Sequence, residues 1–403
     1  MKVVDSSRLM IANATFFDGY SAELKEGPIL IAEGRVVELG GPSQPKSGER
    51  VIDAAGGTVI PGLIDAHFHA YAAGLNALEI EARPLSYLAL SGARRLASAL
   101  RRGFTTVRDV SGGDPGLASA INEGLLPSPR YLYTGPALSQ TGGHGDFRPG
   151  ELNLCACGSH MAEVVDGADD LRRAVRDRFR RGAHAIKLMT SGGVMSPTDP
   201  IRIPQYSPAE VRAVSEEAER RGSYVAAHAY SAEAIVHSVE NGVRSIEHGN
   251  LLDSAAAEVM AHHGAFLVPT LATYDAMERL GAGLGLAPAA QSKNREVLDA
   301  GLRAIEIARA AKVRVGFGTD LMGGLETEQL QGLRLQVEVD GVLDTLRSVT
   351  STNAELLGRD DLGRIAVGAT ADLVILYGNP LDDPSLLWTR VEQRTVVQHG
   401  QTV

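Results

Sequence analysis

The amino-acid sequence predicts an α/β fold, a (β/α)8 TIM-like barrel with a second, small β-sandwich domain formed by both chain termini. Apolar runs of strand length alternate with amphipathic stretches of helical period through residues 61–358. Short strand patterns without a helical period occupy residues 1–60 and return in residues 359–403. Ionisable side chains recur at the ends of the central apolar runs, which is where barrels of this class carry their chemistry.

Both ends of the chain have the pattern of strands and turns. The first strands are expected at Leu9–Phe17, Ile29–Ile31, Val36–Leu39 and Val51–Asp53. The same pattern returns at residues 371–376 and 391–397. We expect the two ends to pair, so that residues 1–60 and 359–403 form one discontinuous domain around a barrel at 61–358.

Eight apolar runs supply the predicted barrel strands. They cover Gly62–His69, Thr105–Val110, Tyr131–Leu138, Ala185–Thr190, Tyr224–Ala229, Ser245–Glu247, Ala265–Leu271 and Arg314–Gly318. The amphipathic stretches predict helices over Tyr87–Arg102, Asp169–Arg181, Pro208–Arg221, Ala232–Asn241, Ser254–His263, Asn294–Ala311 and Glu326–Val339, with a weaker one near Pro115–Glu123. Capping residues such as Ser207 and Ser231 precede several of them. The longer connections Tyr71–Pro84 and Leu271–Gln291 are expected to be loops able to act as lids.

Composition and charge restrict the classes of partner. The 403 residues carry a formal net charge of −10 and no basic run, which argues against nucleic acid or an anionic membrane. No apolar stretch is long enough to span a bilayer, and the first residues lack the apolar core of a signal peptide. The two cysteines, Cys155 and Cys157, are too few for a disulfide framework or a structural zinc site. We therefore expect a cytoplasmic protein.

The first barrel strand ends in two histidines one residue apart, His67 and His69. Because side chains alternate between the faces of a strand, these two imidazoles point the same way, as two ligands of one metal do. An isolated pair of this kind is also compatible with two structural histidines. The residues at the other strand ends decide between the two interpretations.

Those other strand ends carry a matching set of ionisable residues. Lys187 lies inside the fourth strand, His228 ends the fifth, His248 ends the sixth and Asp320 ends the eighth. A lysine within an apolar strand is costly unless it is neutralised or paired. Since the carboxyl ends of barrel strands meet at one mouth, we expect all these side chains to converge there.

A further charged pair ends the second strand. Arg108 and Asp109 are adjacent in the sequence. We expect them to form a buried ion pair that supports the barrel and takes no part in catalysis.

This set of residues resembles the amidohydrolase superfamily over essentially the whole chain. The segments Ser139–His144, Ile186–Pro200 and His228–Tyr230 are similar to the branch that holds Xaa-Pro dipeptidases (prolidases), related peptidases that release C-terminal amino acids, and ochratoxin-type amidases. Imidazolonepropionase is a more distant relative.

The resemblance implies a centre of two divalent metal ions, with zinc as the expected metal. A lysine carboxylated by CO2, here Lys187, would bridge the two ions. By the same resemblance His67, His69, Lys187 and Asp320 would bind one ion, and His228, His248 and Lys187 would bind the other. The physical chemistry agrees, because burial favours the neutral amine that reacts with CO2, and imidazole and carboxylate groups suit zinc.

The resemblance also implies roles in catalysis and binding. Asp320 would deprotonate the water that bridges the metals and so turn it into a hydroxide. It would later pass the proton to the leaving amine. His144 would polarise the scissile carbonyl, and Tyr230 would bind the substrate carboxylate. Backbone N–H groups of Gly192, Gly193 and Val194 would line the pocket. A structural role in the loop for His144, and packing at the rim for Tyr230, are the alternatives.

The leading functional hypothesis is hydrolysis of the amide or peptide bond to a C-terminal amino acid, in an Xaa-Pro-type dipeptide or an N-acyl amino acid such as ochratoxin. Hydrolysis of a cyclic amide, urea or carbamate is the first alternative, since the metal centre does not determine what the pocket admits. A non-catalytic assembly protein is the second, and the complete ligand set argues against it. The expected partners are a small-molecule substrate and further copies of the chain in a homo-oligomer.

Overall fold

The computed structural model describes residues 8–41, 45, 49–148, 160–196, 199–389 and 391–403. Cys155 and Cys157 lie outside the described residues. The chain divides into two compact units. One unit comprises Met1–Asp65, Ser98–Thr106 and Leu333–Val403, and the other Ala66–Ala97 and Val107–Gly332. The domain boundaries expected after residues 60 and 358 stay a prediction.

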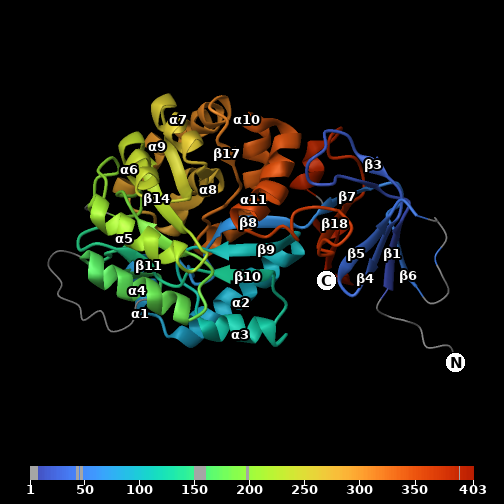
Figure 1. The fold of residues 1–403 in the computed structure, drawn as a ribbon, viewed down its shortest axis with the longest axis horizontal. Coiled ribbons are helices and arrows are strands. Elements are labelled where there is room, and N and C mark those ends of the chain that lie inside the picture. The colour runs from blue at the N-terminus through green and yellow to red at the C-terminus, as the bar shows by residue number, and fades with distance from the viewer. Residues whose placement is uncertain (1–7, 42–44, 46–48, 149–159, 197–198, 390) are drawn as a thin grey trace. The chain divides into compact units, whose positions relative to one another are not determined.

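The unit with both termini contains two β-sheets. One sheet has the order β5-β4-β1-β6 and the other the order β20-β19-β18-β7-β2-β3. The strands are β1 (Arg8–Ala12), β2 (Thr15–Phe16), β3 (Lys25–Glu26), β4 (Ile29–Ala32), β5 (Arg35–Leu39), β6 (Arg50–Asp53), β7 (Thr58–Pro61), β18 (Leu373–Leu376), β19 (Thr395–Gln398) and β20 (Gln401–Thr402). Figure 1 shows the red strand β18 beside the blue strand β7, with which it pairs antiparallel.

Side chains from both sheets share one apolar core. Leu9 and Ile31 come from the first sheet, and Phe16, Val59 and Leu373 come from the second. Alternate residues of strand β4 are buried and half-buried, which is the period of a strand with one face in a core. The predicted pairing of the two chain ends into a small β-sandwich is therefore confirmed.

The barrel strands follow the predicted order along the chain. They are β8 (Leu63–Phe68), β9 (Phe104–Asp109), β10 (Arg130–Tyr133), β11 (Ala137–Ser139), β13 (Ile186–Met189), β14 (Val225–Ser231), β15 (Ser245–Leu251), β16 (Phe266–Val268) and β17 (Arg314–Val315). From β11 through β13 to β17, successive strands pair in parallel. Strands β8 to β10 form the adjoining three-stranded sheet. The expected (β/α)8 class is confirmed.

Hydrogen bonds close the barrel beside β17. Ala66 N–H donates to the carbonyl of Phe317, and Asp320 N–H donates to the carbonyl of His67 at 2.8 Å. The third predicted strand, Tyr131–Leu138, is split into β10 and β11, because Gly135 has φ 72° and Pro136 follows it. A short strand, β12 (Ala162–Val164), extends the sheet beside β11 and was not expected from the sequence.

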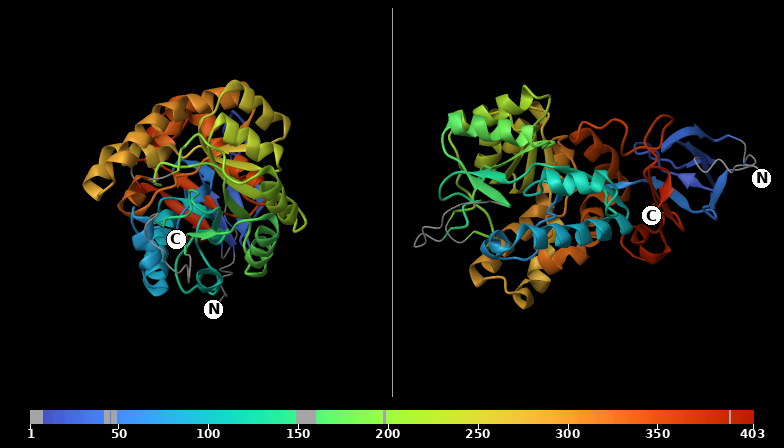
Figure 2. Two further views of the ribbon diagram at one scale, coloured as in Figure 1. Left: turned by 90° about the vertical axis from the view of Figure 1, so that its left-hand side faces the viewer. Right: turned by 90° about the horizontal axis from the view of Figure 1, so that it is seen from below.

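Helices connect the strands and lie outside them, as the green, yellow and orange ribbons in Figure 2 show. They are α1 (Ala77–Ala82), α2 (Leu85–Arg101), α3 (Pro115–Asn122), α4 (Ala168–Arg180), α5 (Pro208–Glu219), α6 (Ala232–Glu240), α7 (Ser254–His262), α8 (Leu271–Leu280), α9 (Pro288–Ala310), α10 (Gln331–Arg347) and α11 (Asn353–Leu356). Among the described residues, none of the helices is both long enough and apolar enough to cross a bilayer.

The predicted helix starts are correct where a capping side chain is present. Ser207 forms a capping box with Glu210, and the Ser231 side chain accepts from Ala234 N–H. The expectation of a lid loop at Leu271–Gln291 is wrong, because Leu271–Leu280 is helix α8. Thr270 precedes this helix, and its side chain makes no capping hydrogen bond.

Candidate metal centre

The six predicted metal ligands meet at one cavity. His67 lies on β8, Lys187 on β13, His228 on β14 and His248 on β15. The cavity is lined by His67, His69, Lys187, His228, His248 and Asp320. The structure therefore brings together, from strands that are far apart in the sequence, every residue that was expected to share the mouth of the barrel.

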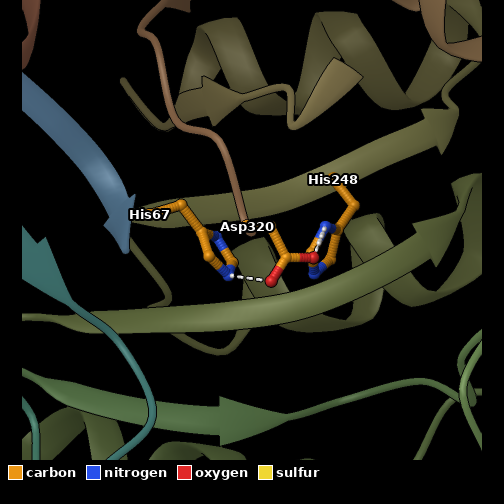
Figure 3. Close-up of side chains that lie close together, drawn as sticks. All are labelled: His67, His248 and Asp320. Atoms are coloured by element: carbon orange, nitrogen blue, oxygen red, sulfur yellow. Dashed lines mark ion pairs between the residues drawn. The ribbon is translucent and has the colours of Figure 1, made fainter. Parts of the chain in front are cut away.

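The Asp320 carboxylate lies between three of the imidazoles. Its Oδ1 atom is 2.8 Å from Nε2 of His69 and 3.5 Å from Nε2 of His67. Its Oδ2 atom is 3.9 Å from Nδ1 of His248. Figure 3 shows the carboxylate between His67 and His248. One ligand atom each of His67, His248 and Asp320 lies within 4.8 Å of the others, a spacing at which a metal ion can be bound.

Each of three histidines has one ring nitrogen held by a neighbouring residue. Nδ1 of His67 is 2.7 Å from Oε2 of Glu247. Nδ1 of His248 is 2.8 Å from Oγ1 of Thr270. For His228 the bonded nitrogen is Nε2, 3.2 Å from the carbonyl oxygen of Gly192. A partner on one nitrogen fixes the orientation of the ring and directs the other nitrogen to a ligand.

The Glu247 carboxylate is itself held by a buried arginine. Arg108 Nη2 lies 2.7 Å from Oε1 of Glu247, and both side chains are fully buried. Arg108 Nε also donates to the carbonyl of Ala66. The expected ion pair between Arg108 and Asp109 is wrong. Neighbouring strand residues point to opposite faces, and Asp109 instead accepts from Tyr131 Oη at 2.7 Å.

Burial favours the protonation states that bind a metal. It lowers the pKa of His67, His228 and His248 well below the ordinary value, and the charge of Lys187 adds to this effect. Neutral imidazole is the form that binds a metal. Burial alone would raise the pKa of Asp320, but the nearby histidines His67 and His69 outweigh it and keep that pKa below its ordinary value. The carboxylate is therefore ionised.

Lys187 is the buried cation of the site. It is 2% exposed, and its Nζ atom has no hydrogen-bond partner among the described residues. Burial lowers the pKa of Lys187 to about 8. An unpaired buried amine is costly in a finished protein, so this atom requires a further partner. Together with the four imidazoles and Asp320, it makes a donor set that fits a metal pair bridged by a carboxylated lysine.

Two of the predicted ligands have a strained backbone. His248 has φ 74° and Asp320 has φ 53°, in the left-handed region that residues other than glycine rarely adopt. Strain of this kind costs about 1–3 kcal/mol per residue and persists where the surrounding structure enforces it. Here it directs both side chains into the cavity.

Three of the predicted catalytic and substrate-binding residues besides Asp320 line the same cavity, but Gly192 and Gly193 do not. His144, Tyr230 and Val194 line it. The His144 ring stacks on the His228 ring with centroids 4.2 Å apart, and Tyr230 Oη is 2.8 Å from Oη of Tyr274. Gly193 N–H donates to Oδ2 of Asp199.

Several residues around the ligands were not expected from the sequence. Glu247, Thr270 and Tyr274 contact His67 or His248. Glu247 could have been recognised by the argument used for Lys187, since it is a charged residue inside a buried strand. Thr270 lies near the end of the predicted seventh strand and carries no charge that would single it out, and Tyr274 lies in the segment expected to be a loop.

Apolar side chains complete the cavity. Five of the eight methionines of the chain line it, together with Leu75, Ile80 and Phe147. They are Met161, Met189, Met195, Met277 and Met322. Methionine side chains adapt to differently shaped ligands. The arrangement can therefore hold a metal pair at its base and an apolar group above it.

The structure is a (β/α)8 barrel with a possible metal site at the mouth, and comparison with known proteins gives the family. Residues 58–403 match the model of the amidohydrolase family. The chain belongs to this family, and the membership supports hydrolysis of amide or peptide bonds as its class of reaction.

Individual relatives share most of the chain. The ochratoxinase of Aspergillus niger is 32% identical over 358 residues, which cover 81% of this chain and 71% of the relative. A crystal structure of a prolidase complexed with N-methylphosphonate-L-proline superposes with a TM-score of 0.95 at 43% identity, covering 98% of this chain and 99% of the other. A Xaa-Pro dipeptidase with methionine in its active site gives a TM-score of 0.86 at 29% identity, covering 98% and 100%.

Proposed function

We propose that this protein is a metal-dependent amidohydrolase that cleaves the bond between an acyl group and a C-terminal amino acid. The substrate would be an Xaa-Pro-type dipeptide or an N-acyl amino acid. The observation that carries the proposal is the convergence of four imidazoles, one carboxylate and one buried amine on a single cavity, where the amine has no hydrogen-bond partner in the described part of the chain. The names of the relatives, ochratoxinase and prolidase, support this choice of bond.

The residues present would hold two divalent ions, which we propose to be zinc. His67, His69 and Asp320 would bind one ion, and His228 and His248 the other. A carbamate on Lys187 would supply the bridging oxygens, because a carboxylated lysine is an anion whereas an ammonium repels cations. When bound, the ions would polarise the amide carbonyl and lower the pKa of the attacking water.

Asp320 would act as the proton carrier. Its ionised carboxylate would accept a proton from the attacking water as the water oxygen bonds to the carbonyl carbon. The same carboxyl group would return the proton to the nitrogen as the carbon–nitrogen bond breaks, so the products are a carboxylic acid and an amine. The left-handed backbone at Asp320 holds the carboxylate in reach of both steps.

His144 and Tyr230 would bind the substrate on either side of the bond that is cut. His144 would polarise the scissile carbonyl as negative charge develops on its oxygen. The Tyr230 hydroxyl, whose pKa burial raises above the ordinary value, would stay protonated and donate to the substrate carboxylate. Val194, which lines the cavity, would shape the wall beside it. Location in the cytoplasm and assembly into a homo-oligomer stay predictions from the sequence.

The test is amine release from a panel of substrates by zinc-loaded protein in bicarbonate buffer. The panel contains Xaa-Pro dipeptides, other dipeptides, N-acyl-phenylalanines including ochratoxin A, and cyclic ureas. We expect turnover of one linear class and its loss in Lys187→Ala. A 13C signal of the carbamate, after growth with labelled bicarbonate, is expected in the wild type and not in Lys187→Ala.

Two outcomes would contradict the proposal. Full activity of Lys187→Ala would exclude the carbamate bridge. No amine release from any linear amide, with both metal sites filled, would favour the alternative of a cyclic amide, urea or carbamate substrate.

A further inference from the structure

The structure gives His144 a buried carboxylate neighbour, Asp199, that lies outside the predicted ligand set. Nδ1 of His144 is 3.5 Å from Oδ2 of Asp199, and the Asp199 side chain is 2% exposed. Nδ1 has no closer hydrogen-bond partner among the described residues. Contacts of catalytic histidines are often long in a free enzyme and shorten when the substrate is bound.

The Asp199 carboxylate is fixed by the loop that it closes. Its Oδ2 accepts from Gly193 N–H and from Nε2 of Gln205, both at 3.2 Å. Oε1 of the same Gln205 accepts from the backbone N–H of His144 at 3.0 Å. The carboxylate and the His144 backbone are thus joined through one amide side chain.

A lysine from helix α9 holds the same loop. Lys293 Nζ donates to three backbone carbonyl groups. They belong to Gly193 (3.0 Å), Ser196 (2.7 Å) and Asp199 (3.1 Å). Burial would raise the pKa of Asp199, but the contact with His144 and the charge of Lys293 outweigh it, and the pKa lies below its ordinary value. The group beside His144 is therefore an anion.

The absence of a side chain at Gly193 makes room for the His144 ring. A Cβ atom at Gly193 would lie 2.1 Å from Cε1 and 2.4 Å from Nδ1 of His144. On its ring face His144 stacks on His228 with an interplanar angle of 15°. The ring thus packs closely against the loop backbone and the His228 ring, with the carboxylate beside Nδ1.

We propose that Asp199 is a positioning residue that keeps a proton on Nδ1 of His144 and so presents the other nitrogen, Nε2, to the cavity. In this arrangement Asp199 acts on the substrate only through His144. With Nδ1 held by the carboxylate, the ring would keep one orientation and one tautomer, and Nε2 would be the nitrogen that faces the substrate. This inference rests on the proposed function. The first test below does not, because it needs no substrate.

The first test is spectroscopic. Long-range 15N–1H spectra of histidine-labelled, zinc-loaded protein report which ring nitrogen carries the proton, and His144→Gln assigns the signals. We expect a protonated Nδ1 on His144 in the wild type and a mixture of tautomers in Asp199→Asn. The same His144 spectrum in both proteins would overturn the proposal, whether or not a substrate has been found.

The second test is a double-mutant cycle on the substrate that the wild type turns over. Asp199→Asn should lower kcat on the order of 10- to 100-fold, the range seen when the outer partner of a histidine ligand is removed, with little change in KM. In the His144→Gln background the same change should cost less than about twofold. An equal cost in both backgrounds would show that Asp199 acts through the fold and not through His144.

Two further variants keep the test decisive. Asp199→Ser, which retains a hydroxyl for Gly193 N–H and removes the carboxylate, replaces Asp199→Asn if the latter does not fold. Asp166→Asn is the matched control, since Asp166 anchors the loop that carries His144, through Thr141 N–H at 2.9 Å, without touching His144 itself. It should keep wild-type kcat and the wild-type His144 spectrum. Loss of either in this control would assign the effect to the loop as a whole.

Discussion

Glu247 holds His67 through Nδ1 at 2.7 Å, and the same carboxylate neutralises Arg108, also at 2.7 Å. All three side chains are buried. One carboxylate therefore orients a predicted metal ligand and balances a charge in the barrel interior.

Replacing this carboxylate should weaken both the site and the fold. Glu247→Gln leaves the Arg108 charge buried without its anion, and breaking a buried pair in this way costs about 3–5 kcal/mol. We expect a lower denaturation midpoint in urea and a metal affinity reduced roughly 10- to 100-fold, measured by competition with a chromogenic chelator. Glu216→Gln, which breaks the exposed pair with Arg172, should change stability by less than about 1 kcal/mol. Equal stability of the two variants would contradict this account.

Removal of the metal should abolish activity and leave the fold intact. The rings of His67, His228 and His248 are each held by a protein partner, so the site does not need the ions in order to form. We expect an unchanged far-ultraviolet circular dichroism spectrum after chelation. The free energy of unfolding should fall by about 2.7 kcal/mol for each ion removed, relative to protein at a free zinc concentration of 100 Kd. Loss of the helical spectrum on chelation would show instead that the ions hold the barrel together.

Gly193→Ala should impair catalysis more than stability. The added Cβ would lie 2.1 Å from the His144 ring, so the ring must leave its place beside Asp199. We expect kcat to fall at least about tenfold, since general acid–base groups contribute on the order of 10²–10⁴. Gly283→Ala is the control, because its Cβ would meet no atom within 4 Å. A crystal structure of Gly193→Ala with His144 unmoved would disprove the explanation.

Acid should remove the stabilisation that Asp361 contributes. Arg359 holds the pKa of this carboxyl group below its ordinary value of 3.8, and Thr370 Oγ1 adds a hydrogen bond. A lowered pKa means that the contribution is complete above pH 3.8 and is lost as the pH falls through the folded-state pKa. Asp361→Asn should therefore destabilise by about 1 kcal/mol at neutral pH and by progressively less in acid.

Urea unfolding of the wild type and Asp361→Asn at several pH values measures this difference. The exposed neighbour Asp360 supplies the control variant, Asp360→Asn, which should unfold like the wild type at every pH. A difference for Asp361→Asn that grows in acid would have the wrong sign.

The sequence was a good guide to the barrel because strand and helix periods are local. His67, Lys187, His228 and His248 could be placed at one mouth from strand alternation and chain order alone. The outer partners of the histidines could not be predicted in the same way. Glu247 lies on β15 and its partner His67 on β8, in a different sheet, so their contact depends on packing that no strand or helix period encodes.

The errors have equally local causes. Helix α8 begins at Leu271, the last residue of the run predicted as the seventh strand, and Gly281 and Gly283 follow it, so a short helix stood between a strand pattern and a glycine-rich stretch. The third barrel strand was predicted as continuous because apolar residues flank Gly135 on both sides, and the left-handed φ of that glycine is not visible in a hydrophobic pattern. The contact between Asp199 and His144 joins two loops, for which no periodicity exists.

The pairing of β18 with β7 has a consequence for the timing of synthesis. Pro61 of β7 pairs with Leu373 of β18. The four buried residues of β7 are therefore synthesised long before their antiparallel partner strand. At about 5–20 residues per second this strand waits roughly 15–60 s on the ribosome. During that interval the barrel is translated in full while an apolar strand edge stays open, a state prone to pairing with other nascent chains. Slower translation of the middle of the gene should therefore lower the yield of correctly assembled protein.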